Sequence, residues 1–181
     1  MTDLRLHNAI VFAARKHTGQ LRKGTDIPYI SHPMEVMDIL RENGCPEHVV
    51  IAGILHDTLE DTGTAPEEIR EKFGEAILRI VQSESEDKTK TWKERKQATI
   101  DHLGGISLAE KQVCCADKLA NLRSMYADQC SIGESLWTRF NASKTDIRWY
   151  YEGIRNNLQG SIGHSPMFQE LDRLIPLVFG E

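Results

Sequence analysis

The sequence has few cysteines, and none of them has the spacing of a metal or redox motif. Its four cysteines include no C-x-x-C pair, and the adjacent Cys114 and Cys115 are poorly placed on a helix to bridge each other; the other two are Cys45 and Cys130. We therefore predict reduced thiols and exclude a cysteine–zinc site. Cys114 and Cys115 are expected to pack as small apolar side chains.

Long apolar runs and an excess of basic charge are also missing. The longest early apolar run, residues 9–14, is too short for a signal peptide or a membrane span, which predicts a cytoplasmic protein without a membrane partner. The 22 basic residues against 27 acidic ones give a net charge of −5. That balance argues against nucleic acid as a partner, which needs a broad basic face, although a small anion can still bind locally.

Strand patterns, internal repeats and linkers are absent from the sequence, whereas helical spacing of apolar residues recurs along it. The 181 residues are 40% hydrophobic and 27% charged, which is ordinary for one soluble globular domain. Leu6, Ile10, Ala13 and His17, for example, recur at intervals of three and four. We predict a single all-α domain, residues 1–181, with about eight to ten helices in a bundle.

Four polar side chains crowd at the end of the apolar run Val49–Leu55. If the helix continues, His56 stacks one turn from Glu60, and Asp57 one turn from Asp61. Three carboxylates and one imidazole in a partly buried place repel one another unless a divalent cation or a proton network compensates them. The alternative is a solvated helix end.

Two distant residues favour the ion. His32 precedes Pro33 at a predicted helix start, and Asp117 interrupts an otherwise apolar helix, so both are polar residues in apolar settings. With His56 and Asp57 they form a set of two histidines and two carboxylates. Such a set suits one hard-to-borderline divalent metal with open positions for water and substrate oxygens. We predict this site between the second, third and long seventh helices.

The arrangement H…HD…D resembles the HD-domain phosphohydrolases. The added pair Glu60-Asp61 and the segments Arg22–Pro33 and Ala116–Arg123 are similar to the hydrolase domain of the bacterial alarmone synthetase/hydrolases, and above all to the stand-alone small alarmone hydrolases. The resemblance spans residues 7–126, and we expect the helices of 132–181 to cover the core. One departure is the turn Gly24–Ile27, which is longer than usual for the family and affects where Arg22 and Lys23 lie.

The resemblance implies a metal-dependent enzyme, usually with manganese, that removes the 3′-pyrophosphate of guanosine tetra- or pentaphosphate. It implies three sets of residues: metal ligands His32, His56, Asp57 and Asp117; catalytic Glu60 and Asp61, which orient the attacking water and accept its proton; and substrate-binding Arg22, Lys23, Lys118 and Asn121. Two alternatives stay open, namely an HD phosphohydrolase of another nucleotide and a nucleotide sensor without catalysis. The oligomeric state is not determined by the sequence.

Several polar and aromatic residues have two interpretations. Arg22 and Lys23 form either a phosphate-binding loop or a solvated basic turn, and Lys118 either supplies charge to the site or extends to solvent. Lys88 is a weaker candidate for phosphate, in a charged loop. The aromatic cluster Trp149–Tyr151 has helical spacing, which favours a core role over contact with a nucleotide.

Overall fold

A computed structural model describes residues 4–180; residues 1–3 and 181, which belong to the predicted domain 1–181, lie outside the described residues. Within residues 4–180 the chain forms ten α-helices and one 3-10 helix, and its only β-type pairing is an isolated bridge between Leu21 and Pro28. The prediction of an all-α fold is confirmed. The elements are α1 (Arg5–Lys16), α2 (Ser31–Glu42), α3 (Glu47–Leu55), α4 (Thr58–Asp61), α5 (Pro66–Phe73), α6 (Glu75–Ser83), α7 (Trp92–His102), α8 (Leu108–Ile132), η1 (Gly133–Arg139), α9 (Lys144–Ile162) and α10 (Pro166–Phe179).

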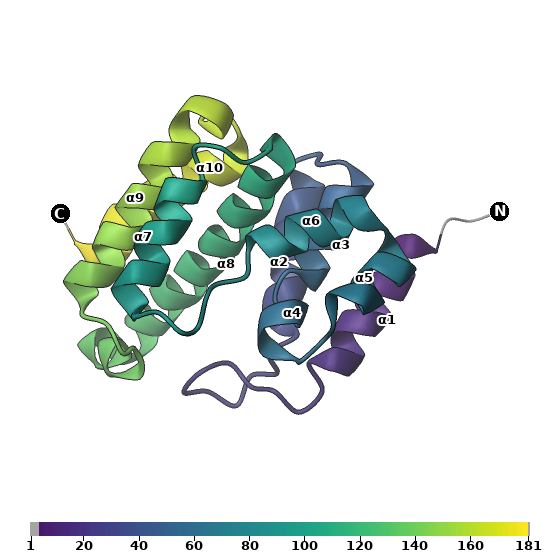
Figure 1. The fold of residues 1–181 in the computed structure, drawn as a ribbon. Coiled ribbons are helices and arrows are strands. Elements are labelled where there is room, and N and C mark those ends of the chain that lie inside the picture. The colour runs from purple at the N-terminus through teal and green to yellow at the C-terminus, as the bar shows by residue number, and fades with distance from the viewer. Residues whose placement is uncertain (1–3, 181) are drawn as a thin grey trace.

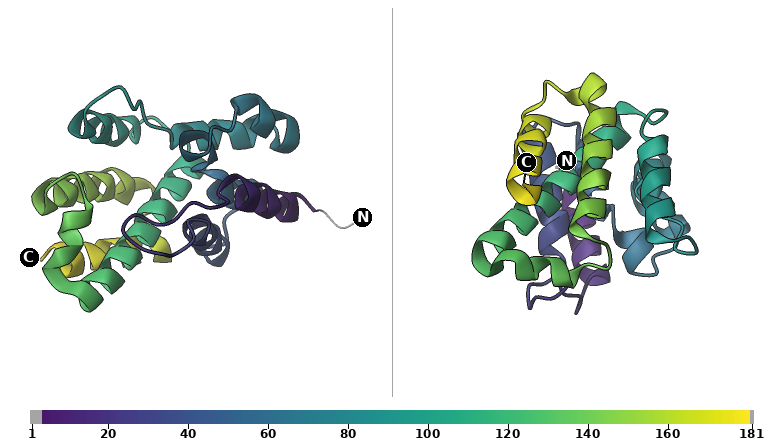
Figure 2. Two further views of the ribbon diagram at one scale, coloured as in Figure 1. Left: turned by 90° about the horizontal axis from the view of Figure 1, so that it is seen from below. Right: turned by 90° about the vertical axis from the view of Figure 1, so that its left-hand side faces the viewer.

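The long helix α8 runs through the middle of the molecule (Figures 1 and 2). Helices α2, α3 and α6 pack on one side of it, and α9, α10 and η1 pack on the other. Ser107 caps its start, because the Ser107 hydroxyl accepts from the Glu110 N–H at 3.4 Å and the Glu110 carboxylate accepts from the Ser107 N–H at 2.7 Å. Gly133, with φ of 59°, ends the helix.

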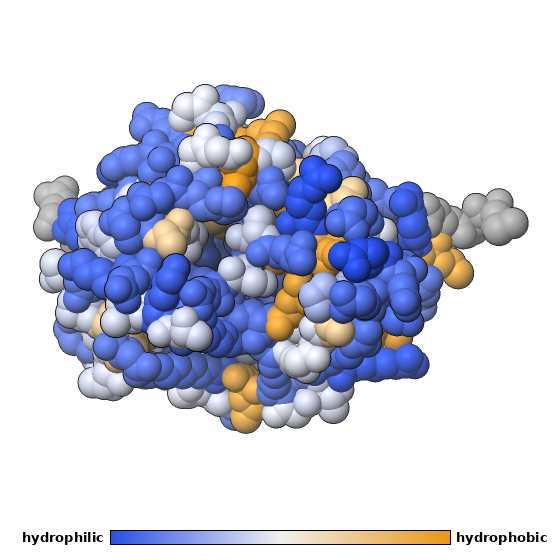
Figure 3. All heavy atoms as spheres, in the orientation of Figure 1, coloured by the Kyte–Doolittle hydropathy of each residue, from blue (hydrophilic) through white to orange (hydrophobic). Residues whose placement is uncertain are grey.

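The core follows α8 and contains most of the larger apolar side chains. Leu119 and Leu122 of α8 are fully buried, as are Leu40, Ile54 and Ile154 from the helices around it. The surface view is mainly hydrophilic, with apolar side chains in small separate groups (Figure 3). Within residues 4–180, no helix combines the length and the hydropathy that a membrane span requires.

Helix α3 is buried on all sides and packs closely against α2. Every residue of its stretch Val49–Leu55 is buried. Gly53 permits the approach, since a Cβ at this position would lie 2.4 Å from Leu40 Cδ1. The close packing brings the end of α3, with His56, beside His32 in the first turn of α2.

The helix that was predicted to continue through His56–Asp61 is interrupted. Helix α3 ends at Leu55, and the single turn α4 begins at Thr58. Two side chains contact backbone carbonyl oxygens at the break. The Thr58 hydroxyl donates to Leu55 O at 2.7 Å, and His56 Nδ1 lies 2.8 Å from Gly53 O. The expected stacking of His56 on Glu60 in one continuous helix is therefore wrong. Asp57 and Asp61 remain one turn apart, joined by an Asp61 N–H to Asp57 O hydrogen bond of 2.9 Å.

Candidate active site

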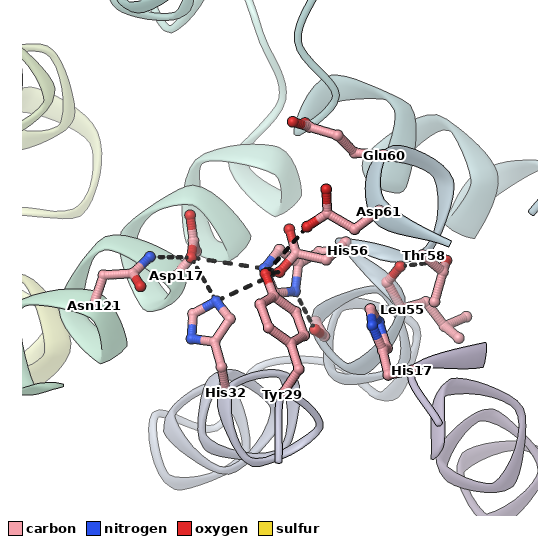
Figure 4. A network of polar contacts seen from close by, with 12 residues as sticks. His17, Tyr29, His32, Leu55, His56, Thr58, Glu60, Asp61, Asp117 and Asn121 are labelled. Atoms are coloured by element: carbon pink, nitrogen blue, oxygen red, sulfur yellow. Dashed lines mark hydrogen bonds and ion pairs between the residues drawn. The ribbon is translucent and has the colours of Figure 1, made fainter. Parts of the chain in front are cut away.

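Four side chains of ligand type converge where α2, the α3–α4 break and α8 meet. Figure 4 labels three of them, His32, His56 and Asp117. His32 Nε2 lies 2.9 Å from Asp117 Oδ1 and 3.6 Å from Asp57 Oδ2. His56 Nε2 lies 3.0 Å from Asp57 Oδ2 and 3.6 Å from Asp117 Oδ1. The structure thus brings together the four residues that the sequence singled out as metal ligands. The long helix that holds Asp117 is α8, because the turn α4 adds a helix to the predicted count.

The spacing of these atoms fits one divalent ion. Ligand atoms about 2.1 Å from a common metal and at right angles to each other lie about 3.0 Å apart, close to the distances found here. His32, His56 and Asp57 each offer an atom within 4.8 Å of the others. His56 Nε2 is buried and makes no hydrogen bond, while Nδ1 of the same ring faces Gly53 O. Because a backbone carbonyl fixes Nδ1 as the protonated nitrogen, Nε2 is left free to ligate.

Opposite charges compensate one another in this cluster. Burial lowers the pKa of His56, but the Asp57 and Asp117 carboxylates outweigh burial and hold that pKa well above its usual range. Burial likewise raises the pKa of Asp57, yet His56 and His32 lower it overall. Burial also opposes ionisation of Asp117, whose pKa is held well below its usual range by Lys118 and the two histidines. The metal-free site is therefore an imidazolium between two carboxylates.

Metal affinity is expected to fall as the pH is lowered. The raised pKa of His56 means that the metal-free protein keeps its imidazole protonated at neutral pH, whereas ligation requires the neutral ring. Each ion therefore displaces about one proton, and the apparent affinity should weaken about tenfold per pH unit below that pKa. Competition titrations with a chelating dye between about pH 6 and about pH 8 measure the slope. A dissociation constant that does not change with pH would contradict the proton displacement.

The predicted catalytic pair lies beside the ligand cluster. Asp61 Oδ1 accepts from Lys88 Nζ at 3.1 Å, and its Oδ2 accepts from the Tyr29 hydroxyl at 3.3 Å. Glu60 Oε2 accepts from the Glu86 N–H at 3.1 Å, and burial raises the pKa of Glu60. Both carboxylates line the same cavity of about 280 Å³ as the ligand cluster.

Three further residues lie at the site in the structure, namely Tyr29, Lys88 and Glu84. The sequence did not predict a role there for Tyr29 or Glu84, and it indicated Lys88 only weakly. The Tyr29 hydroxyl donates to Asp57 Oδ2 at 2.7 Å, as well as to Asp61. Lys88, only a weak candidate, reaches Asp61 and donates to Glu60 O at 2.9 Å. Glu84 lines the cavity, where burial raises its pKa to about 7. Tyr29 stands in the quoted motif before His32, which was a usable signal; nothing in the sequence indicated the direction of the Glu84 side chain.

Three of the four predicted substrate-binding residues lie on one side of the cluster. Asn121 Nδ2 donates to Asp117 Oδ1 at 2.7 Å, and Asn121 Oδ1 accepts from Arg22 Nη2 at 3.0 Å. Lys118 pairs with Asp117. Burial lowers the pKa of Lys118, but Asp117 and nearby groups hold it well above its usual range, so the ammonium stays charged. Lys23 lies farther out, with its Nζ 3.5 Å from Asn141 Oδ1.

The longer turn Gly24–Ile27 folds against the C-terminal half of the chain. Gly24 has φ of 73°, and a Cβ there would lie 2.9 Å from Arg139 Cδ in η1. Thr25 holds the turn closed, since its N–H donates to Arg22 O at 3.0 Å and its hydroxyl to the same oxygen at 2.9 Å. The turn therefore directs Arg22 toward Asn121 despite its length.

A second cavity, of about 360 Å³, adjoins the ligand cavity. The two share five lining residues, namely Tyr29, Trp92, Lys96, Lys118 and Asn121. Arg22, Lys23, Tyr150 and Tyr151 line the second cavity. Tyr150 and Tyr151 of α9 are buried in the core, as their helical spacing predicts, and they also border this space. Together the cavities have the size and the mix of cationic and aromatic groups that suit a nucleotide.

Comparisons with known proteins point in one direction. The HD domain family model matches residues 9–146. Guanosine-3′,5′-bis(diphosphate) 3′-pyrophosphohydrolase MESH1 of Xenopus tropicalis is 44% identical over 117 residues, which are 63% of this chain and 65% of that protein, just under two thirds. The protein of the same name from Homo sapiens is 43% identical over 168 residues, which are 91% of this chain and 89% of that protein. A solved metazoan ortholog of SpoT, described as hydrolysing ppGpp, has a TM-score of 0.79 at 27% identity and covers 96% of this chain and 95% of that chain.

Proposed function

Because this chain belongs to the HD domain family, we propose that it is a metal-dependent phosphohydrolase that removes the 3′-pyrophosphate of guanosine tetra- or pentaphosphate. The observation that carries the proposal is the junction of two cavities: one holds a cluster of metal-ligand type with an acidic pair, and the other is cationic and aromatic. The products are a nucleoside 5′-diphosphate or 5′-triphosphate and pyrophosphate.

His32, His56, Asp57 and Asp117 would hold one divalent ion, and manganese suits them best. The set contains two carboxylates and no thiolate, which favours a harder ion than zinc. When bound, the ion supplies Lewis acidity toward a phosphoryl oxygen and the attacking water. The observation that most directly supports a bound ion is His56 Nε2, which is buried and has no hydrogen-bond partner among the described residues.

Glu60 and Asp61 would activate the attacking water in different ways, with Asp61 orienting it and Glu60 accepting its proton. Asp61 already accepts hydrogen bonds on both oxygens, from Lys88 and Tyr29, so it is suited to orient a water molecule. The pKa of Glu60 is raised by burial. Its oxygen Oε1 forms a long ion pair of 3.5 Å with Lys88 Nζ. Because a raised pKa makes a carboxylate a stronger base, we assign the proton-accepting role to Glu60.

The cationic side of the cavity would bind the pyrophosphoryl group that is attacked. Water attacks the phosphorus attached to the ribose 3′ oxygen and gives a proton to Glu60, the bond between that phosphorus and the 3′ oxygen breaks, and the 3′ oxygen leaves with the nucleoside and takes up that proton. Negative charge grows on the phosphoryl oxygens and the leaving oxygen during this step. Lys118 and Arg22 lie where they neutralise it, and Asn121 holds Arg22 in place through its side-chain oxygen.

Replacing Arg22 with methionine is expected to lower kcat/KM for guanosine tetraphosphate by about 10- to 100-fold while leaving metal content unchanged. A hydrogen bond to a charged group contributes about 1.5–3 kcal/mol, and Arg22 touches Asn121 rather than any predicted ligand. Steady-state kinetics measure the effect. Arg41→Met is the matched control, because Arg41 is exposed and pairs with Asp38. Equal losses in both variants, or no loss in Arg22→Met, would argue against a substrate role.

A nucleotide panel tests the function itself. Manganese-loaded protein is incubated with guanosine tetraphosphate and with simple nucleoside mono-, di- and triphosphates, and the products are separated by anion-exchange chromatography. Guanosine diphosphate and pyrophosphate are expected from the tetraphosphate. Orthophosphate from a simple nucleotide, with the tetraphosphate left intact, would favour a general nucleotide phosphohydrolase. Binding of the tetraphosphate without turnover of any nucleotide would favour a sensor.

A further inference from the structure

Gln20 joins three separate segments that lie behind the active site. Its Nε2 donates to Asp61 O at 2.6 Å, and its Oε1 lies 2.7 Å from His17 Nδ1. The Gln20 backbone oxygen accepts from the Tyr29 N–H at 2.8 Å. One residue therefore connects the end of α1, the loop that leads to His32 and the turn α4.

The contact with Asp61 matters because α4 cannot hold its own shape. It has four residues, and a single turn leaves most of its backbone groups without partners inside the helix. Asp61 is its last residue, so Asp61 O is one of the carbonyls that needs a partner from outside. Gln20 supplies that partner and fixes the backbone from which the Asp61 carboxylate extends.

The partner of Gln20 is a buried histidine that has no place in the proposed chemistry. His17 is 2% exposed, and its Nε2 has no hydrogen-bond partner. Since the amide nitrogen of Gln20 donates to Asp61, the amide oxygen faces His17, and the proton between them belongs to His17 Nδ1. Asp61 O can only accept, which sets the direction of the Gln20 amide, and the contact with His17 Nδ1 holds the amide oxygen in that orientation.

Tyr29 completes the arrangement. Its ring lies against the His17 ring, with centroids 5.1 Å apart and an angle of 30° between the planes. Its hydroxyl donates to both Asp57 and Asp61, and Figure 4 shows Tyr29 pointing from its loop toward Asp61. His17 and Gln20 thus hold Asp61 from two directions, through its backbone and through Tyr29.

We propose that Gln20, oriented by His17, is a positioning residue that sets the place of the Asp61 carboxylate for hydrolysis. The inference rests on the proposed function and deepens it. Gln20 touches none of the four proposed metal ligands directly, and it does not line either cavity. Its loss should therefore change kcat rather than KM or metal content.

A double-mutant cycle between Gln20→Met and Asp61→Asn tests this inference in the manganese-loaded protein. Gln20→Met alone is expected to lower kcat about 10- to 100-fold, because small misplacements of a catalytic group have effects of this order, with KM and manganese content unchanged. In the Asp61→Asn background the same substitution should change kcat by less than about twofold, since there is no carboxylate left to position. Gln97→Met is the control, because Gln97 bonds only to Asp101 on the exposed side of α7.

The outcomes separate this inference from the proposed function. Fully additive losses, a raised KM or lost manganese would overturn the positioning role while leaving the function intact. No hydrolysis of any nucleotide by the wild-type protein would overturn both. If circular dichroism shows that the Gln20→Met variant is not folded, His17→Phe replaces it in the same cycle. That variant keeps the ring against Tyr29 but removes the donor to Gln20, and it should show the same non-additivity with Asp61→Asn.

Discussion

Asp57→Ala is expected to lose the divalent ion and, with it, turnover of guanosine tetraphosphate by about 10³-fold or more. Asp57 Oδ2 accepts from the Tyr29 hydroxyl at 2.7 Å, and it lies 3.0 Å from His56 Nε2 and 3.6 Å from His32 Nε2. Alanine removes a negative ligand from a site with only two carboxylates. Several kcal/mol of metal-derived stabilisation of the transition state would be lost, which corresponds to the expected factor.

Metal analysis of the purified variant, together with steady-state kinetics, measures both effects. Asp38→Ala is the control, since Asp38 is an exposed aspartate of α2 that pairs with Arg41. It should retain metal and activity. Full metal stoichiometry in Asp57→Ala would show that Asp57 is not a ligand, and the proposed ligand set would have to be revised.

The second large effect separates catalysts from ligands. Glu60→Gln and Asp61→Asn are expected to keep the ion and to lower kcat by about 10²- to 10⁴-fold, the range for loss of general-base catalysis. Both variants preserve side-chain size and one acceptor oxygen, which can keep the contact from the Glu86 N–H to residue 60 or the contact from Lys88 to residue 61, while they remove the negative charge. Glu60→Gln should have the larger effect, because Glu60, whose pKa is raised by burial, is the residue proposed to accept the proton.

Kinetics and metal content are again measured together. Glu67→Gln is the control, since Glu67 is exposed on α5 and pairs only with Arg70. Retained activity in both active-site variants would remove the acidic pair from the mechanism. Loss of the ion in either variant would instead make that residue a ligand.

The ligand cluster was predictable because its members are polar residues in sequence segments whose apolar pattern predicts a buried core. His32 and Asp117 are 4% and 6% exposed, so their polarity has to be compensated inside the protein. Helical spacing then fixed which elements they belong to, and the resemblance to the small alarmone hydrolases linked them to His56 and Asp57. The family assignment and the all-α fold are confirmed, whereas the roles of the individual site residues stay predictions.

What the sequence did not predict depends on contacts between distant segments. The interruption after Leu55 results from side chains of His56 and Thr58 that take backbone carbonyls, and helical periodicity carries no information about such competition. Lys88 and Gln20 reach α4 from loops 28 and 41 residues away in sequence. Their side-chain directions are set only once the helices have packed, so local patterns show them as solvated loop residues.

Hydrolysis of guanosine tetraphosphate in water enriched in ¹⁸O tests the central claim most directly. Mass spectrometry of the products locates the bond that is broken and the atom that is attacked. The proposed reaction predicts one ¹⁸O atom in pyrophosphate and none in guanosine diphosphate, because water attacks the phosphorus at the ribose 3′ oxygen. Labelled orthophosphate, or ¹⁸O in the nucleoside product, would contradict it.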